Sequence, residues 1–240
     1  MSASPLSLSD DFDPPRLVIF DCDGTLVDSQ HHIVSAMHSA FAANGLGLPD
    51  AESVRRTVGL PLEVAIERLL LPLGSPAPVP VIDAYKTAAI AQRLEPDHHE
   101  PLFPGLVATL DRLEQAGFLL GVATGKARRG LNFTLTTHGL SDRFVTLQTC
   151  DVVAAGKPAP DMVLQAMAET GAVPASTIVV GDTTYDMEMA RNAGVAAIGV
   201  SWGYHEESVL LAAGASSIIK DFGELPDLVI EMMARSSSSV

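Results

Sequence analysis

The chain has 240 residues, which is enough for one large domain or two modest ones, and a hydrophobic content of 47% excludes global disorder. No apolar run approaches the roughly 18 to 20 residues that span a bilayer. The formal charge of −14 argues against a nucleic-acid partner, because such a partner requires a basic surface. Two cysteines are too few for a disulfide framework. Residues 1–15 lack the pattern of a signal peptide and are expected to form a frayed leader, so we expect a cytoplasmic protein.

The first predicted element is a strand over Leu17–Phe20, an all-apolar run typical of a buried parallel strand. Residues 30–101 then favour helices only, and from residue 105 onward strands and helices alternate, which indicates βαβ units and a parallel sheet. The predicted later strands are Phe118–Thr124, Phe144–Thr149, Thr177–Asp182 and Val195–Ser201. The predicted helices are His31–Ala43, Leu62–Leu70, Ile82–Leu94, Gly105–Ala116, Ala127–His138, Asp161–Thr170, Thr183–Asn192 and Glu206–Ala213. We therefore predict an α/β fold with a doubly wound, Rossmann-like parallel sheet over 1–28 and 102–240, and a second, helical domain over 29–101.

Two carboxylates, Asp21 and Asp23, directly follow the first predicted strand. In an open α/β sheet the carboxyl ends of the strands form the edge where ligands bind. Gly24 and Thr25 then turn the chain, so that free backbone N–H groups remain beside the acids for an anion. This segment predicts an anion-handling acidic site at the end of the strand.

Three further motifs fall at the same edge. Thr124 and Gly125 end the second strand, where a hydroxyl and helix N–H groups can bind phosphate, although a plain helix cap explains the threonine as well. Lys157 precedes two prolines at positions 158 and 160 that stiffen its segment, and a surface lysine is the alternative. Asp182 and Asp186 lie one helical turn apart after the fourth strand, where capping is the alternative.

Electrostatics connects these motifs. A carboxylate about 4 Å from a phosphate dianion is repelled by on the order of 8 kcal/mol at an effective dielectric near 20. Cations must cancel that repulsion, and Lys157 is one candidate. Hard oxygen ligands from Asp21, the Asp23 carbonyl and Asp182 suit Mg²⁺, which is the second.

The order of these motifs resembles that of the haloacid dehalogenase-like hydrolases, whose first motif, Asp-x-Asp-Gly-Thr, begins here at Asp21. The resemblance implies that Asp21 is a nucleophile that forms an aspartyl-phosphate and that Asp23 is the general acid and base. It assigns phosphate binding to Thr124, Gly125 and Lys157, and Mg²⁺ ligation to Asp182. Asp186 matches a second acid near the lysine and the metal waters. An acid at position 23 is similar to the phosphatase and phosphomutase branches.

The helical insertion resembles the small cap of the subfamily that includes phosphoglycolate phosphatase, β-phosphoglucomutase and pyrophosphatases. The stretch from Val122 to Lys126, with Arg128 and Arg129 after it, is most similar to the phosphoglycolate phosphatase-like group. Cations are disfavoured at a helix N-terminus, so this basic cluster indicates an anion nearby or exposed charges facing a lid. Thr57–Pro61 resembles a cap loop in which Gly59 permits close approach to the substrate.

The resemblance thus implies an Mg²⁺-dependent phosphomonoester hydrolase of a small phosphorylated metabolite, with phosphoglycolate as the favoured substrate. We expect no nucleic-acid or membrane partner, and a monomer or homodimer. Sugar-phosphate or nucleotide phosphatase, pyrophosphatase and β-phosphoglucomutase activities remain alternatives. A phospho-aspartate signalling receiver also uses acids, a threonine and a lysine, but such modules are shorter and have no helical insertion. A catalytically inactive binding protein is disfavoured because all motif residues are present.

Overall fold

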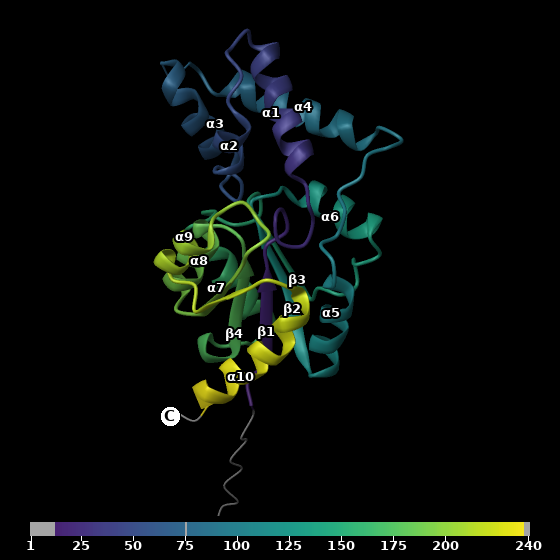
Figure 1. Ribbon diagram of the computed structural model, residues 1–240, viewed down its shortest axis with the longest axis vertical. Coiled ribbons are helices and arrows are strands. Elements are labelled where there is room, and N and C mark those ends of the chain that lie inside the picture. The colour runs from purple at the N-terminus through teal and green to yellow at the C-terminus, as the bar shows by residue number, and fades with distance from the viewer. Residues whose placement is uncertain (1–12, 75, 238–240) are drawn as a thin grey trace, which may run out of the picture.

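The structure, a computed structural model, describes residues 13–74 and 76–237. The expected leader over residues 1–15 therefore lies almost entirely outside the described residues. A six-stranded sheet forms the centre of the molecule (Figure 1), with the strand order β3-β2-β1-β4-β5-β6 and every neighbouring pair parallel. The strands are β1 (Arg16–Phe20), β2 (Phe118–Thr124), β3 (Thr146–Thr149), β4 (Thr177–Gly181), β5 (Ala196–Val200) and β6 (Ser217–Ile219). The predicted fold class, a doubly wound parallel sheet, is confirmed.

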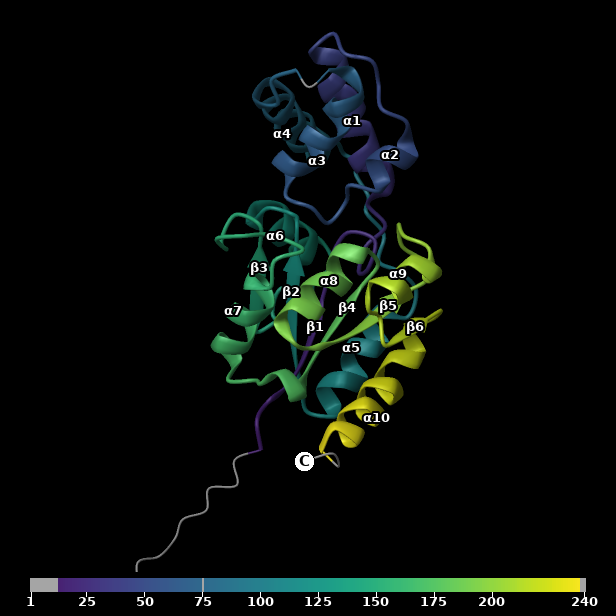
Figure 2. The ribbon, with the colours of Figure 1, turned by 90° about the vertical axis from the view of Figure 1, so that its left-hand side faces the viewer.

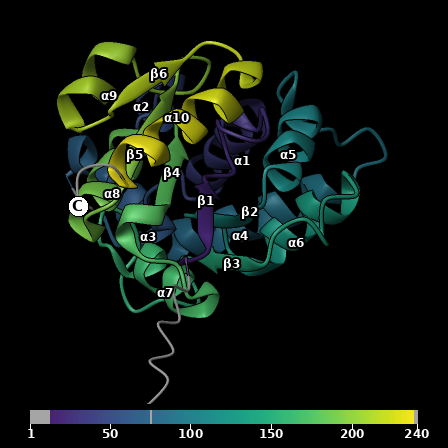
Figure 3. The same cartoon turned by 90° about the horizontal axis from the view of Figure 1, so that it is seen from below.

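Helices cover both faces of the sheet, as the view from below shows (Figure 3). Alternate residues of β1 point to opposite faces, so Val18 and Phe20 join one hydrophobic core and Leu17 and Ile19 join another. The first core contains residues of α5 (Leu106–Gln115), α6 (Arg128–Thr137) and α10 (Leu225–Ser237). The second contains residues of α7 (Asp161–Thr170), α8 (Thr184–Ala193) and α9 (Glu207–Ala213). Burial on both faces explains the all-apolar β1.

Four helices form a separate layer above the carboxyl ends of the strands (Figure 2). They are α1 (Gln30–Ala43), α2 (Ala51–Arg55), α3 (Leu62–Leu70) and α4 (Val79–Arg93). Short 3₁₀ turns occur at Leu71–Leu73 in this layer and at Pro174–Ser176 and Phe222–Glu224 in the core. The layer has its own core, in which Met37, Phe41 and Ile66 pack together. We call residues 29–101 the cap. The division into cap and core stays a proposal, and the separate hydrophobic core supports it.

The two linkers between the core and the cap are paired with each other. The Asp28 N–H donates to the Pro101 carbonyl at 2.9 Å, and the Phe103 N–H donates to the Leu26 carbonyl at 3.0 Å. An isolated antiparallel bridge joins Val27 to Leu102 between these bonds. The chain therefore leaves and re-enters the core at one fixed point.

Most predicted elements agree with the structure to within a few residues, and Phe118–Thr124, Leu62–Leu70 and Asp161–Thr170 agree at both ends. Helix α4 begins three residues earlier than predicted, because Pro80 fits the first helical turn, where no N–H is needed. The third strand starts at Thr146 rather than Phe144. The elements α2, β6 and α10 were not predicted from the sequence, and the first two are too short to show a period. Among the described residues, no helix is both long and apolar enough to cross a membrane.

Candidate active site

Strand ends bring the predicted acids and hydroxyl together. Phe20, the last residue of β1, aligns with Val122 of β2 and Val180 of β4, so Asp21 lies beside the ends of both neighbouring strands. The Asp21 N–H donates to the Val180 carbonyl at 2.9 Å, which extends the ladder by one residue. Asp21, Thr124 and Asp182 are each at most 1% exposed. These three side chains therefore share a buried site at the edge where the strand order reverses, the usual ligand position in such sheets.

Lys157 lies inside this site and not on the surface. Its Nζ is 2.7 Å from Asp21 Oδ1 and 2.6 Å from Asp186 Oδ1, and its side chain is fully buried. These are ion-pair distances, although the angles fall outside hydrogen-bond geometry. The other Asp186 oxygen accepts from the Thr183 N–H at 3.0 Å and from Thr183 Oγ1 at 2.7 Å. The lysine is thus held between the predicted nucleophile and the second acid of α8. We refer to Lys157, Asp21, Asp182 and Asp186 as the Lys157 centre.

Asp182 is fixed by two donors from different segments. Thr25 Oγ1 donates to Asp182 Oδ1 at 2.8 Å, and the Tyr204 N–H donates to Asp182 Oδ2 at 2.9 Å. Thr25 belongs to the turn after β1, and Tyr204 to the loop after β5. Asp182 is therefore oriented from both sides, as a ligand that must hold one position requires.

The acids of the Lys157 centre fit a hard divalent cation. Single carboxylate oxygens of Asp21, Asp182 and Asp186 all lie within 4.8 Å of one another. Both Asp21 oxygens are buried without a hydrogen-bond partner among the described residues. Three buried carboxylates meet one lysine, so the centre lacks positive charge, and carboxylate oxygens are the ligands that Mg²⁺ prefers. The Asp23 side chain lies outside this cluster; ligation by its carbonyl stays a prediction.

The charge excess appears in the pKa values of the acids. Burial raises the pKa of Asp21 to about 7; the negative charge of Asp186 adds to this effect, and Lys157 opposes it. Burial, with Asp21 and Asp186 beside it, raises the pKa of Asp182 well above its ordinary value. A bound cation would reverse both shifts, because it favours the charged form of each ligand.

Asp23 has a lysine of its own. Lys126 Nζ lies 2.6 Å from Asp23 Oδ1 and 3.4 Å from Glu100 Oε2, and Glu100 Oε2 also accepts from Thr134 Oγ1 at 3.1 Å. Burial would raise the pKa of Asp23, but the Lys126 ammonium outweighs it and holds the pKa below its ordinary value. We call Lys126, Asp23 and Glu100 the Lys126 centre.

In the sequence, Lys126 stands out only as part of a basic cluster. The signal was the cluster itself, because a cation placed at a helix N-terminus requires an anion nearby. The anions are now identified as Asp23 and Glu100, which Lys126 contacts directly. Glu100 had no signal of its own, since it stands in an irregular linker.

The phosphate-binding candidates lie where the core meets the cap. Thr124 Oγ1 accepts from the Lys126 N–H at 3.1 Å, so the hydroxyl caps the turn and faces the site edge. A Cβ on Gly125 would lie 2.7 Å from the Gly59 carbonyl oxygen. Gly59 itself has a φ of +93°, and its own Cβ would lie 3.2 Å from Thr183 Oγ1. The structure therefore brings Thr124, Gly125 and Gly59 together, and the cap loop contacts the core through two glycines.

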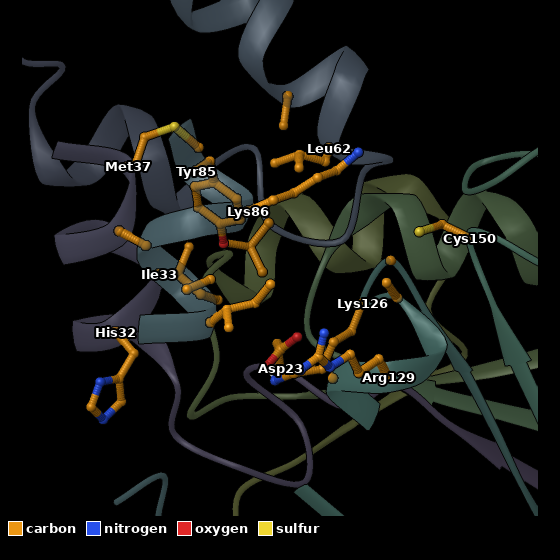
Figure 4. Close-up of a pocket in the computed structure, with 18 of the residues that line it drawn as sticks. Asp23, His32, Ile33, Met37, Leu62, Tyr85, Lys86, Lys126, Arg129 and Cys150 are labelled. Atoms are coloured by element: carbon orange, nitrogen blue, oxygen red, sulfur yellow. Dashed lines mark hydrogen bonds and ion pairs between the residues drawn. The ribbon is translucent and has the colours of Figure 1, made fainter. Parts of the chain in front are cut away.

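A cavity of about 390 Å³ lies between the cap and the strand ends. Figure 4 shows its two sides, with Asp23, Lys126 and Arg129 on the core side and with Ile33, Met37 and Tyr85 on the cap side. The cavity gives a bound molecule direct access to Asp23, whereas Asp21 and Lys157 are buried and do not line it.

Comparison with known proteins identifies the family. Residues 18–200 match the haloacid dehalogenase-like hydrolases. The chain belongs to this family. It is 40% identical to the probable phosphatase IndB of Dickeya dadantii, over 93% of this chain and 97% of that protein. It is 31% identical to the phosphoglycolate phosphatase of Agrobacterium fabrum, over 100% of this chain and 99% of that protein.

Solved structures agree with this assignment. A hydrolase from Pseudomonas syringae superposes with a TM-score of 0.80 at 26% identity, covering 90% of this chain and 98% of that one. The predicted resemblance is thereby confirmed, and so is the prediction of an enzyme of the phosphatase type. The roles of individual residues remain proposals that rest on the geometry above.

Proposed function

We propose that the chain is a phosphomonoester hydrolase that uses Asp21 as the nucleophile, Asp23 as the general acid and base, and Mg²⁺ bound at the Lys157 centre. The observation that carries this proposal is the buried Asp21, whose Oδ1 lies 2.7 Å from the Lys157 ammonium and whose Oδ2 has no partner among the described residues. A carboxylate kept unsolvated beside a cation is available for attack on phosphorus once the metal neutralises its neighbours.

In the first step, an Asp21 oxygen attacks phosphorus and the ester P–O bond breaks. Asp23 is a carboxylate in the free site and is protonated in the substrate complex, where the negative charge of the phosphate raises its pKa. It gives that proton to the departing alcohol oxygen and becomes the carboxylate that Lys126, 2.6 Å away, stabilises. In the second step, Asp23 takes a proton from water, and the water oxygen attacks phosphorus and displaces the Asp21 carboxylate. Alcohol and inorganic phosphate are the products, and both acids return to their initial states.

Lys157 and the Thr124–Gly125 turn bind the phosphoryl group in this proposal. Lys157 sits behind Asp21 and is held there by Asp186 at 2.6 Å, so its charge is fixed where the phosphoryl oxygens arrive. Asp21 and Asp182, with Asp186 close by, would hold Mg²⁺. The metal supplies positive charge that lowers the repulsion between the nucleophile and the phosphate.

Phosphoglycolate is the first substrate to assay, because relatives from Agrobacterium fabrum and Caulobacter vibrioides are named phosphoglycolate phosphatases. The probable phosphatase IndB, at higher identity, carries no substrate in its name. We propose a small phosphorylated metabolite as the substrate class. We further propose a cytoplasmic monomer or homodimer that binds neither nucleic acid nor membranes, in keeping with the acidic composition.

Trapping the phosphoenzyme tests this function. The enzyme is mixed with ³²P-labelled phosphoglycolate and Mg²⁺, quenched in acid within milliseconds, and digested, and the labelled peptide is identified. We expect the label on Asp21 and its release by hydroxylamine, which cleaves acyl phosphates. Asp21→Asn should remove the label, whereas Asp28→Asn, which makes the same change seven positions away, should retain it. Label on another residue, or Asp21→Asn with unchanged turnover, would refute the assignment.

A further inference from the structure

The cavity between cap and core is larger than glycolate requires. Its volume is about 390 Å³, which lies within the range of about 300–1,000 Å³ typical of small-molecule sites. The leaving group of phosphoglycolate has five non-hydrogen atoms, which fill roughly 150 Å³ if each takes the volume of one water molecule. The phosphoryl group binds deeper, at Asp21, so this cavity accommodates the leaving group alone. More than half of the space has no occupant when glycolate is bound.

The cap side of the cavity has an apolar part beside charged side chains such as Lys86 and Arg93. Ile33 and Met37 of α1, Leu62 of α3, and Tyr85 and Ile90 of α4 line this apolar part. The apolar side chains gain by covering a hydrocarbon or ring surface and gain nothing from a carboxylate. Figure 4 shows Met37, Tyr85 and Ile33 grouped on one side of the cavity, across from Asp23.

One polar group on this wall, His98, makes no hydrogen bond among the described residues, and its Nε2 lies 3.9 Å from Glu100 Oε1. The His98 side chain is 5% exposed. Its ring packs in a tilted arrangement on His32 at 4.3 Å and edge-on to Phe133 at 5.7 Å between centroids. Burial, and then the nearby His32, lowers the pKa of His98, so the ring is neutral and presents one donor and one acceptor. A buried donor and acceptor of this kind match a hydroxyl group.

We infer that the preferred substrate is a phosphate ester of a hydroxylated, ring-sized alcohol, whose body packs on Ile33, Met37 and Tyr85 and whose hydroxyl bonds to His98. This inference rests on the proposed function, because it concerns the leaving group that Asp23 protonates. Phosphoglycolate is then a small substrate that leaves the cap wall unused. Binding energy from that wall is available to raise turnover of larger esters.

Three primary alkyl esters separate the features of the leaving group: 2-phosphoglycolate is small, benzyl phosphate has a ring without a hydroxyl, and ribose 5-phosphate has both. Steady-state kcat/KM is measured for each ester with Mg²⁺. We expect ribose 5-phosphate to exceed phosphoglycolate by at least about tenfold, in line with what matched pocket contacts contribute to specificity. A wild-type enzyme that prefers phosphoglycolate overturns the inference without any variant.

Two variants locate the effect. Ala89→Leu adds volume inside the cavity, and Ala88→Leu adds the same volume on the same helix outside it. We expect Ala89→Leu to lower kcat/KM for both ring esters by about tenfold. The same variant should keep kcat/KM for phosphoglycolate within about twofold of the wild-type value. Ala88→Leu should change kcat/KM for none of the three esters. His98→Phe keeps the packed ring and should lower only ribose 5-phosphate. Uniform losses on all three esters, or no loss with His98→Phe, contradict the inference.

The outcomes also distinguish this inference from the proposed function. If Asp21→Asn abolishes turnover of all three esters and phosphoglycolate is the best substrate, the function stands and the inference fails. If turnover of the esters survives Asp21→Asn, the function itself fails.

Discussion

The two buried lysines of the site are similar in contacts and opposite in effect. Lys157 lies between Asp21 and Asp186, and Lys126 lies between Asp23 and Glu100. Yet the pKa of Asp21 rises to about 7, whereas the pKa of Asp23 falls below its ordinary value. The difference lies in the surrounding charge. Asp186 and Asp23 add negative charge around Asp21, whereas Arg93 adds positive charge around Asp23.

The two centres therefore have different roles. The Lys157 centre lacks positive charge and is completed by a divalent cation. The Lys126 centre does not lack positive charge, and Lys126 controls the charge of its acid, Asp23. With the lysines alone, the nucleophile Asp21 has the higher pKa and the acid Asp23 the lower one, which is opposite to their proposed roles. A bound cation would lower the pKa of Asp21 and keep it ionised for attack. The predictions below test whether this division holds.

The largest effect is expected at the nucleophile. Asp21→Asn removes the attacking charge and should lower kcat by at least about a thousandfold, on the scale seen when a nucleophile is removed. The melting temperature should not fall, because the substitution also removes a buried carboxylate that its surroundings disfavour. Turnover within about tenfold of wild type would contradict the assignment.

Metal dependence distinguishes the Lys157 centre from the Lys126 centre. Chelation by EDTA should abolish activity and Mg²⁺ should restore it, whereas Ca²⁺, with its looser and larger coordination, should bind and inhibit. Asp182→Asn should raise the Mg²⁺ concentration needed for half-maximal activity. Glu100→Gln, in the other centre, is the control and should leave that concentration unchanged. Full activity in chelator would refute the metal site.

The pKa of Asp21 predicts how metal binding depends on pH. Without metal the carboxyl is protonated below about pH 7, and its proton competes with the cation. Mg²⁺ affinity measured by calorimetry should therefore increase as the pH rises from about 6 to about 8, by up to about tenfold for each unit below the pKa. In buffers of different ionisation enthalpy, the same titrations should show proton release at the lower pH. A pH-independent affinity would mean that Asp21 is already ionised.

Lys126→Met tests the second centre. Without the ammonium, burial dominates and the pKa of Asp23 rises. Because Asp23 acts as the acid, the alkaline limb of the kcat/KM profile should then move to higher pH. At neutral pH kcat/KM should fall by about tenfold to a hundredfold, since the Asp23 carboxylate formed in the first step loses its countercharge. Arg129→Met, a neighbouring basic residue that makes no ion pair among the described residues, is the matched control. An unchanged pH profile would show that Lys126 does not control Asp23.

The smallest effect is expected where the cap loop meets the core. Gly125→Ala places a methyl group 2.7 Å from the Gly59 carbonyl oxygen, so the loop must shift. We expect kcat/KM for metabolite esters to fall by about tenfold and for p-nitrophenyl phosphate to fall less, because that ester draws less on the cap. Gly47→Ala, whose Cβ would meet nothing closer than 3.9 Å, is the control. Gly59→Val is a poorer test, because its positive φ strains any side chain and would itself lower the melting temperature.

The sequence predicted the Lys157 centre more completely than the Lys126 centre, and the reason is physical. Asp21, Thr124 and Asp182 each directly follow or end a strand, and parallel strands end at one edge, so their meeting follows from topology. Glu100 stands in an irregular linker, and the cavity residues Ile33, Met37 and Tyr85 lie on cap helices whose packing against the core no local period reveals. Helix α10 was predictable, since Leu225, Val229 and Met233 recur at helical spacing and are buried.

The paired linkers have a consequence for how such a protein can change over evolution. The hydrogen bonds of Asp28 to Pro101 and of Phe103 to Leu26 join the two linkers where the cap leaves the core. Every residue of the inserted segment lies between two points that are already joined. A different helical segment could therefore replace it without altering the sheet or the acids at its edge. Glu100 and Arg93 are exceptions, because both lie inside the inserted segment; Glu100 contacts Lys126, and the charge of Arg93 lowers the pKa of Asp23. A transplanted cap would need an acid at the same place to preserve the tuning of Asp23.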